Sequence, residues 1–345
     1  MKTILFFTFF FLQSLLLRAQ HAELMKYATI NSETNYIYHL NYSTSGSKII
    51  LNLNQQGGLL LDSSLHEISP IYYPNFQSSG FTKITDNEMY VLQIQDNYDE
   101  NFSQLSILKL EDNSNLFIKL PLFSKYIPFS SCNKVLIYVD GFFDIYNIET
   151  GELEKEKCID ISEEHTKSIT SMMVYENDTK LLLNYTKRPP KFTDLLLYDM
   201  RDFSLKKRMP KPAFNISETL LSRDKQFYFY SLSQPDFVKE SVHIKSCKTD
   251  SLVDSIPTNL EHILEVALSP DNSFLIIRDY HLNLYHFDRK SRKLTPLIEC
   301  GLDDNFGAIA ICPDNKHFLV SMNGNKLLKY KIVLENEVEA RFEME

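Results

Sequence analysis

Short runs of apolar residues recur along the chain at nearly constant intervals. They begin at positions 48, 88, 134, 180, 226, 273 and 316, so successive intervals are 40, 46, 46, 46, 47 and 43 residues. The runs are Lys48–Leu53, Glu88–Gln93, Lys134–Val139, Lys180–Tyr185, Gln226–Ser231, Ser273–Arg278 and Lys316–Ser321. Each is followed by a second run, such as Leu327–Ile332, in which apolar and polar residues alternate. This alternation is typical of half-buried antiparallel strands, so the pattern predicts seven strand-rich units and almost no helix.

A repeat of this length fits one architecture. Units of about 40 to 50 residues with four short strands are typical of β-propeller blades. The 345 residues alone would favour two domains, but the repeat continues through almost the whole chain. The sequence therefore predicts an all-β fold, a seven-bladed β-propeller of four-stranded antiparallel blades over residues 21–345. We expect either the segment Met25–Ile30 or the segment Val338–Phe342 to complete the last sheet, because closure removes exposed strand edges.

The turns between the runs contain little glycine. The chain has nine Gly residues among 345, well below the usual frequency of about 7%. The tripeptide Pro-Asp-Asn occurs in both Ser269–Asn272 and Cys312–Asn315, and these residue types favour a tight turn. We therefore expect Asn, Asp and Pro to form most turns in place of glycine.

Two of the units resemble a known class of repeat. The segments Ala267–Ile277, Leu284–Asp288 and Arg292–Thr295, and the second copy Ile309–Val320, resemble the propeller repeats of the WD-repeat and TolB-like families. The chain departs from the WD-repeat pattern, since it contains no Trp and no Gly-His dipeptide. The hydrogen-bond network of that family therefore does not carry over, and the resemblance implies a divergent propeller.

The first twenty residues, Met1–Gln20, form a separate segment. Lys2 precedes the run Ile4–Leu17, whose 14 mostly apolar residues are fewer than the roughly 20 that a membrane-spanning helix needs. This pattern predicts a signal peptide over residues 1–20, cleaved between Gln20 and Glu23, and a secreted or periplasmic protein. An uncleaved N-terminal anchor is the alternative. No later segment is long and apolar enough to predict a membrane span.

Charge and cysteine content exclude several kinds of partner and site. With 36 basic and 45 acidic residues the net charge is −9, which argues against a nucleic acid partner. None of the five cysteines forms a CxxC motif, so zinc-ribbon and thioredoxin-like sites are excluded. Most of the cysteines are expected to be small buried residues, and Cys300 with Cys312 is the first pair to test for a disulfide.

Catalytic motifs are absent from the sequence. It contains no GxSxG, GxGxxG, GxxxxGK[ST] or HExxH motif. His281 and His286 are expected on opposite faces of one strand, where they could not hold one metal ion. Asp96–Glu100 lacks the residue order of a calcium loop and is interpreted as a solvated loop. We expect no catalytic residue, metal or cofactor, with a propeller enzyme whose site lies in the central channel, lactonase-like or another hydrolase, as the alternative.

Three connections between first and second runs are longer than the others. They are Asp96–Ser103, Thr186–Thr193 and Gln234–Glu240. In the propellers that this chain resembles, such connections open on one face and often bind partners. The three carry aromatic, basic and acidic side chains of the kind that anchor interfaces, namely Tyr98, Phe102, Arg188, Phe192, Asp236 and Phe237. The sequence therefore predicts an exported, monomeric, non-catalytic propeller that binds a protein partner there, the alternative being that these loops are tolerated insertions.

Overall fold

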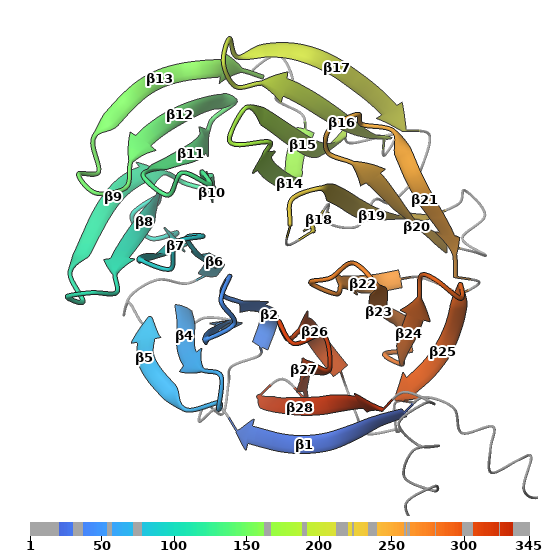
Figure 1. The fold of residues 1–345 in the computed structure, drawn as a ribbon. Coiled ribbons are helices and arrows are strands. Elements are labelled where there is room, and N and C mark those ends of the chain that lie inside the picture. Colours follow the sequence, from blue (N-terminus) through green and yellow to red (C-terminus); the bar gives the residue numbers. More distant parts are fainter. Residues whose placement is uncertain are drawn as a thin grey trace, which may run out of the picture.

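The chain forms a ring of β-sheets. A computed structural model describes residues 21–29, 37–53, 57–71, 78–161, 167–187, 192–211, 220–222, 224–233, 240–258, 260, 263–279, 281–298, 306–323 and 325–333. These residues form seven four-stranded antiparallel sheets arranged around a central axis (Figure 1). The described elements are all strands. The predicted all-β, seven-bladed propeller is therefore confirmed.

The blades follow one another along the chain. Blade 1 contains β2 (Ile37–Tyr42), β3 (Lys48–Leu53), β4 (Gly57–Asp62) and β5 (Glu67–Ile71), and blade 2 contains β6 (Ser78–Ile84), β7 (Tyr90–Asn97), β8 (Phe102–Lys109) and β9 (Asn115–Pro121). Blade 3 contains β10 (Lys125–Pro128), β11 (Lys134–Val139), β12 (Phe142–Asn147) and β13 (Leu153–Asp160), and blade 4 contains β14 (Lys167–Tyr175), β15 (Lys180–Lys187), β16 (Phe192–Asp199) and β17 (Ser204–Lys211).

The remaining three blades complete the circle. Blade 5 contains β18 (Leu220–Leu221), β19 (Phe227–Ser233), β20 (Glu240–Ser246) and β21 (Leu252–Pro257), and blade 6 contains β22 (Ile263–Leu268), β23 (Phe274–Asp279), β24 (Leu284–Asp288) and β25 (Lys293–Ile298). Blade 7 contains β26 (Phe306–Ile311), β27 (His317–Met322), β28 (Lys326–Val333) and, from the other end of the chain, β1 (His21–Thr29). The first strand of each blade lies nearest the axis (Figure 1).

The apolar runs of the sequence are the second and third strands of the blades. β3 and β11 have the predicted bounds, and β15 begins at the predicted Lys180. The other second strands begin one or two residues later than predicted, because the polar residue at the start of those runs belongs to the preceding turn. The period of the sequence therefore identifies equivalent strands.

The ring is closed by the N-terminal strand. β1 pairs antiparallel with β28, from His21 opposite Val333 to Thr29 opposite Lys326. Of the two predicted closing segments, Met25–Ile30 is the right one, although the strand already begins at His21. Residues 338–342 lie outside the described residues. The closing contact joins parts of the chain that are about 300 residues apart, so blade 7 cannot be complete until both ends have been made.

The core lies between the blades. Leu92 and Ile94 of blade 2 face Val135 and Ile137 of blade 3 in one buried apolar cluster. A comparable cluster joins Ile49 and Leu51 of blade 1 to side chains of blade 7. Burying one such side chain contributes about 1.5 to 3 kcal/mol. Because the faces of a blade are covered by its neighbours, most of the stability of each blade comes from the ring.

Each blade has the same turn between its first and second strands, which we call the inner turn. At the equivalent position in all seven inner turns the backbone is left-handed, with φ between 57° and 79°. In six of the seven, the N–H of this residue donates to the carbonyl three residues earlier. The seven residues are Gly46, Glu88, Cys132, Asp178, Lys225, Asn272 and Asn315.

The left-handed residue of an inner turn contacts the turn of the preceding blade. The carboxylate of Glu88 accepts a hydrogen bond of 2.5 Å from the N–H of Ser45. Asp178 accepts hydrogen bonds of 2.6 and 2.9 Å from the N–H groups of Ser130 and Ser131. The amide of Asn315 accepts one of 3.2 Å from the N–H of Asp271. These contacts connect neighbouring blades at one face of the ring and satisfy backbone donors there.

The inner turn of blade 5 is the exception. Its left-handed residue, Lys225, forms an ion pair with Asp86 of blade 2 and donates a hydrogen bond of 2.5 Å to Ser130 Oγ of blade 3. Blades 2 and 3 are not neighbours of blade 5, so this side chain reaches across the mouth of the central channel. Lys225 thereby links three blades at this face.

Glycine is replaced by other residues at most positions with positive φ. The described residues include 19 non-glycine residues with positive φ and three glycines. Asn and Asp are common among them, as predicted, but Glu88, Cys132 and Lys225 also adopt this backbone. A left-handed backbone costs most residues about 1 to 2 kcal/mol. The contacts of the ring must offset that cost.

The four cysteines among the described residues form no disulfide. Cys132, Cys158, Cys247 and Cys312 are free thiols, and all but Cys158 are fully buried. Cys312 Sγ lies 2.7 Å from the hydroxyl of Tyr42, at the junction of blades 7 and 1. Cys300 lies outside the described residues. The expectation that most cysteines are small buried residues is met by three of these four, whereas Cys312 is not part of a disulfide.

Gly46 should be the least replaceable residue of the inner turns. A Cβ at Gly46 would lie 2.1 Å from Cγ of Pro313 across the junction of blades 1 and 7, and the φ of Gly46 is +79°. Gly46→Ala should therefore lower the free energy of unfolding by about 2 to 4 kcal/mol, through backbone strain and overpacking. Asn315→Ala, at the equivalent position of blade 7, should cost about half as much, because it loses one hydrogen bond and keeps a backbone that is already left-handed. Chemical denaturation measures both, and equal losses would contradict this account of the junction.

Candidate functional site

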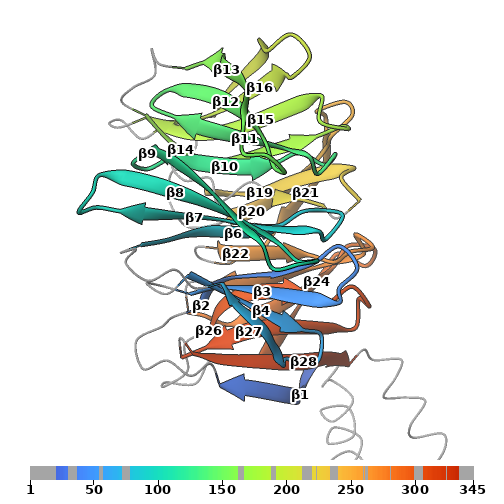
Figure 2. The same ribbon diagram turned by 90° about the vertical axis from the view of Figure 1, so that its left-hand side faces the viewer.

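The hairpins between the second and third strands of the blades form the face opposite the inner turns. We call them the central hairpins. They share this face because successive antiparallel strands alternate in direction, and Figure 2 shows the hairpin of β7 and β8 projecting from this rim. The three predicted binding loops are the central hairpins of blades 2, 4 and 5. The described strand ends that flank these loops lie on this face, whereas residues 188–191 and 234–239 lie outside the described residues.

These hairpins are shorter than the sequence predicted. Asp96 and Asn97 continue β7 and Phe102 opens β8, so the loop of blade 2 is reduced to residues 98–101. In blade 4, β15 extends to Lys187, which pairs with Phe192 at the start of β16. Phe102 and Phe192 are therefore strand residues and not loop residues. The strands are longer because their polar ends still form ladder hydrogen bonds although they carry no apolar pattern.

Tyr98 belongs to an exposed aromatic pair. It lies at the tip of the blade 2 hairpin with 44% of its surface exposed, and its ring centroid lies 5.9 Å from that of Phe123. Phe123 belongs to the connection between β9 and β10 and is 62% exposed. Aromatic rings at this separation attract one another, but burial of these two surfaces is far from complete. The pair leaves a contiguous apolar surface facing solvent at the junction of blades 2 and 3.

The sequence analysis missed Phe123. Its backbone is left-handed, with φ of 64°, which is unusual for a bulky side chain. Strained backbone at an exposed position is characteristic of functional surfaces, where contacts and not local preference determine the conformation. Its signal in the sequence is an aromatic residue in the three-residue connection between β9 and β10, which joins two blades, whereas the predicted binding residues all lie in connections within blades.

Phe102 is half-buried beside the same hairpin. The ammonium of Lys119 lies 4.0 Å from the centroid of the Phe102 ring. This cation–π contact holds the ring against β9. Phe102 therefore supports the hairpin from one side, and its exposed surface is smaller than that of Tyr98.

The remaining predicted site residues cannot be placed. Arg188, Asp236 and Phe237 lie outside the described residues, and only the backbone of Phe192 is described, in its pair with Lys187. The expected convergence of the three hairpins across the channel mouth therefore stays a prediction. The structure brings Tyr98 together with Phe123, whereas Phe102 opens the following strand and contacts Lys119.

Acidic residues at the blade 2 hairpin stabilise the turn. The hydroxyl of Ser103 donates to a carboxylate oxygen of Asp96 over 2.5 Å, and the N–H of Glu100 donates to the side chain of Asn97 over 3.0 Å. These bonds are typical of side chains that stabilise turns. The interpretation of Asp96–Glu100 as a solvated loop is right only for the exposed residues 98–100, because Asp96 and the buried Asn97 belong to β7.

The described channel side chains take part in contacts between strands. Glu265 on the inner strand β22 pairs with Arg278 at 3.2 Å and accepts a hydrogen bond of 3.0 Å from the N–H of Ile309 in blade 7. Within the described parts of the chain, no three His, Cys, Asp or Glu side chains are grouped to hold a metal ion. Nor do those parts contain a helix of the length and apolarity that a membrane crossing needs.

His286 is buried away from the channel. It lies on β24, 2% exposed, with its ring centroid 4.8 Å from that of Phe274. His281 precedes this strand in the turn after β23, so the expectation that both histidines share one strand is wrong. Burial lowers the pKa of His286 to about 4. His286 is therefore a neutral core residue.

The buried His286 predicts an acid-sensitive fold. Its pKa is about 4 in the folded state and about 6.5 in the unfolded chain. Between these pH values the imidazole is protonated in the unfolded chain but stays neutral in the folded protein. The free energy of unfolding should therefore fall by about 3 kcal/mol as pH drops from 6.5 to 4. His286→Phe should remove this loss, whereas a change at the exposed His66, such as His66→Gln, should keep it. Denaturant titrations at both pH values measure the difference, and an equal loss in His286→Phe would contradict it.

The comparisons with known proteins show the fold alone. No family model matches the chain, and no curated protein matches it. Among solved structures, it is similar to the β-propeller domain of Cps50 (Swd1) from Myceliophteria thermophila, with 11% identity and a TM-score of 0.67, covering 88% of this chain and 99% of that one. It is also similar to Kuenenia stuttgartiensis hydrazine synthase, with 9% identity and a TM-score of 0.62, covering 89% and 97%. The chain is thus a divergent β-propeller.

Proposed function

We propose that the chain is an exported, non-catalytic β-propeller that binds a protein partner through the face of the central hairpins. The observation that carries the proposal is the exposed pair formed by Tyr98 and Phe123. The fold supports it as well, because a propeller presents many loops on one rigid face.

The chemistry of the pair suits protein recognition. Tyr and Phe offer large rigid surfaces, and aromatic residues are enriched at the centres of protein interfaces. The two residues come from separate connections of neighbouring blades, so their relative position is fixed by the ring and not by one flexible loop. A partner that covers both would gain apolar burial with little loss of conformational freedom.

The proposed site also includes the predicted binding residues of blades 4 and 5. We infer that the central hairpins of blades 4 and 5 extend this surface around the channel mouth. Their residues in the proposed site are Arg188 and Phe192 in blade 4 and Asp236 and Phe237 in blade 5. Export follows from the signal-peptide pattern of residues 1–20, which would leave β1 at the mature N-terminus. The propeller acts as a monomer in this proposal.

The aromatic pair can be tested by substitution. Tyr98→Ala combined with Phe123→Ala should weaken capture of the native partner by at least about tenfold, since truncating an interface anchor typically costs about 2 kcal/mol or more. The free energy of unfolding should change by less than about 1 kcal/mol, because both side chains are largely exposed. The measurement is quantitative capture from the exported proteins of the native source with immobilised wild-type and variant protein.

A matched control distinguishes specific binding at the Tyr98–Phe123 pair from non-specific binding to any exposed apolar residue. Leu252 and Val253 are equally exposed apolar residues on β21, the outermost strand of blade 5. Leu252→Ala combined with Val253→Ala should leave capture unchanged. If both double variants capture the partner as well as the wild type does, the pair at Tyr98 is not the binding site.

A further inference from the structure

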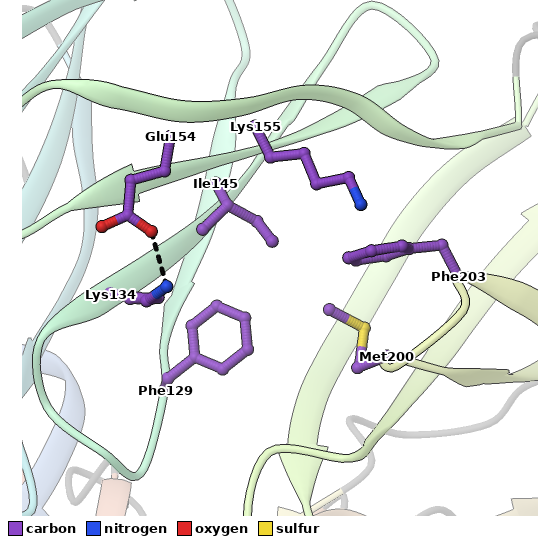
Figure 3. A pocket seen from close by; sticks show the side chains of 7 residues that line it. All are labelled: Phe129, Lys134, Ile145, Glu154, Lys155, Met200 and Phe203. Atoms are coloured by element: carbon purple, nitrogen blue, oxygen red, sulfur yellow. Dashed lines mark ion pairs between the residues drawn. The ribbon is translucent and has the colours of Figure 1, made fainter.

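A pocket lies between blades 3 and 4, on the face of the inner turns. Its volume is about 340 Å³, which is within the range of small-molecule sites. Figure 3 shows that side chains from both blades line it. They are Phe129, Lys134, Ile145, Glu154, Lys155, Met200 and Phe203. The pocket is therefore on the side of the ring opposite the central hairpins, and it is separate from the proposed partner site.

Four of the seven lining side chains are apolar and three are charged. Phe129 and Ile145 of blade 3 and Met200 of blade 4 are buried residues of one core cluster. In the view of Figure 3, Phe129 lies below the pocket and Ile145 above it. Phe203, in the turn between β16 and β17, forms the opposite wall. A compact apolar group placed here would contact aromatic, aliphatic and thioether surfaces.

The polar groups of the pocket carry a net positive charge. Lys134 and Glu154 form an ion pair of 2.6 Å at one end, so their charges cancel. At the other end the ammonium of Lys155 lies 3.8 Å from the centroid of the Phe203 ring. Among the described residues no carboxylate pairs with Lys155. Two lysines and one glutamate therefore leave one uncompensated cation in the pocket.

Phe203 and Lys155 occupy defined positions. The backbone of Phe203 is left-handed, with φ of 59°, a conformation that a bulky residue rarely adopts. This conformation orients the ring beneath the ammonium group, as Figure 3 shows. Because the cation–π contact and the apolar wall involve the same ring, the charge is placed at the edge of the apolar surface.

We propose that this pocket binds a carboxylate attached to a compact apolar group. The apolar group would occupy the space between Phe129, Met200 and Phe203, while the carboxylate would accept a charge-assisted hydrogen bond from Lys155. Such a ligand could be a small free acid or the C-terminal residue of a protein chain. Both present the same chemistry to the pocket.

The test compares two ligands that differ only in charge. N-acetyl-L-phenylalanine and its uncharged amide are titrated into the full protein at neutral pH and low salt, and binding is followed by ligand-observed NMR. The acid should bind at least about tenfold more tightly than the amide, because the hydrogen bond from Lys155 is charge-assisted only with the acid. Equal affinities, or no saturable binding of the acid, would overturn the proposal.

Two lysine variants make the test specific. Lys155→Met keeps the apolar stem over Phe203 and should reduce the preference for the acid to less than about twofold. Lys157→Met is the matched control, since Lys157 lies on the same strand with its ammonium 5.0 Å from the Phe142 ring, and it should keep the preference. A preference that survives Lys155→Met would overturn the proposal. Melting temperatures of both variants establish that the fold is intact.

A peptide distinguishes the two sources of the carboxylate. A tetrapeptide ending in phenylalanine with a free carboxylate is compared with N-acetyl-L-phenylalanine in the same titration. If the pocket serves a protein C-terminus, the peptide should bind at least about tenfold more tightly, because its preceding residues add contacts with the protein outside the pocket. Equal affinities support a small free acid. In either case, the proposal holds only if Lys155→Met removes the preference for the carboxylate over the amide.

Discussion

Each blade of this protein has two apolar faces that it cannot cover by itself. A four-stranded sheet of about 25 residues buries too little surface to be stable alone, so every blade depends on both neighbours. The clusters that join blade 2 to blade 3 and blade 1 to blade 7 show this dependence in the described residues. The ring must therefore close, and β1 closes it by pairing with β28.

The two faces of the ring differ in the contacts that their described residues form. On the inner-turn face, left-handed residues such as Glu88 and Asp178 connect successive blades, and Lys225 reaches across the channel mouth. These contacts link the blades at that face into one connected frame. The opposite face carries the exposed aromatic pair of Tyr98 and Phe123, held apart from the frame by the length of the strands. In the proposed function, the connected blades hold the Tyr98–Phe123 pair in a fixed position for a partner.

The repeat period was enough to predict the ring, because strand burial leaves a strong signal in apolar residues such as those of β3 and β11. Closure by the N-terminal strand was predicted only as one of two alternatives, since His21–Thr29 shows no period of its own. The left-handed backbone of Lys225 and Phe123 was not predicted, because neither Lys nor Phe favours this conformation and a sequence pattern does not show where a turn requires it. The pocket beside Phe203 depends on how blades 3 and 4 meet, and no local pattern encodes that junction.

Hydrogen exchange in a chain that lacks residues 21–29 tests ring closure most directly. If every blade depends on its neighbours, protection should be lost in the amides of β28, in β26 and β27, and in blade 1, where Gly46 meets Pro313. Adding a peptide of residues 21–29 should restore it. If faster exchange were confined to the β28 amides that pair with β1, blade 7 would be stable without closure, and the central claim would be contradicted.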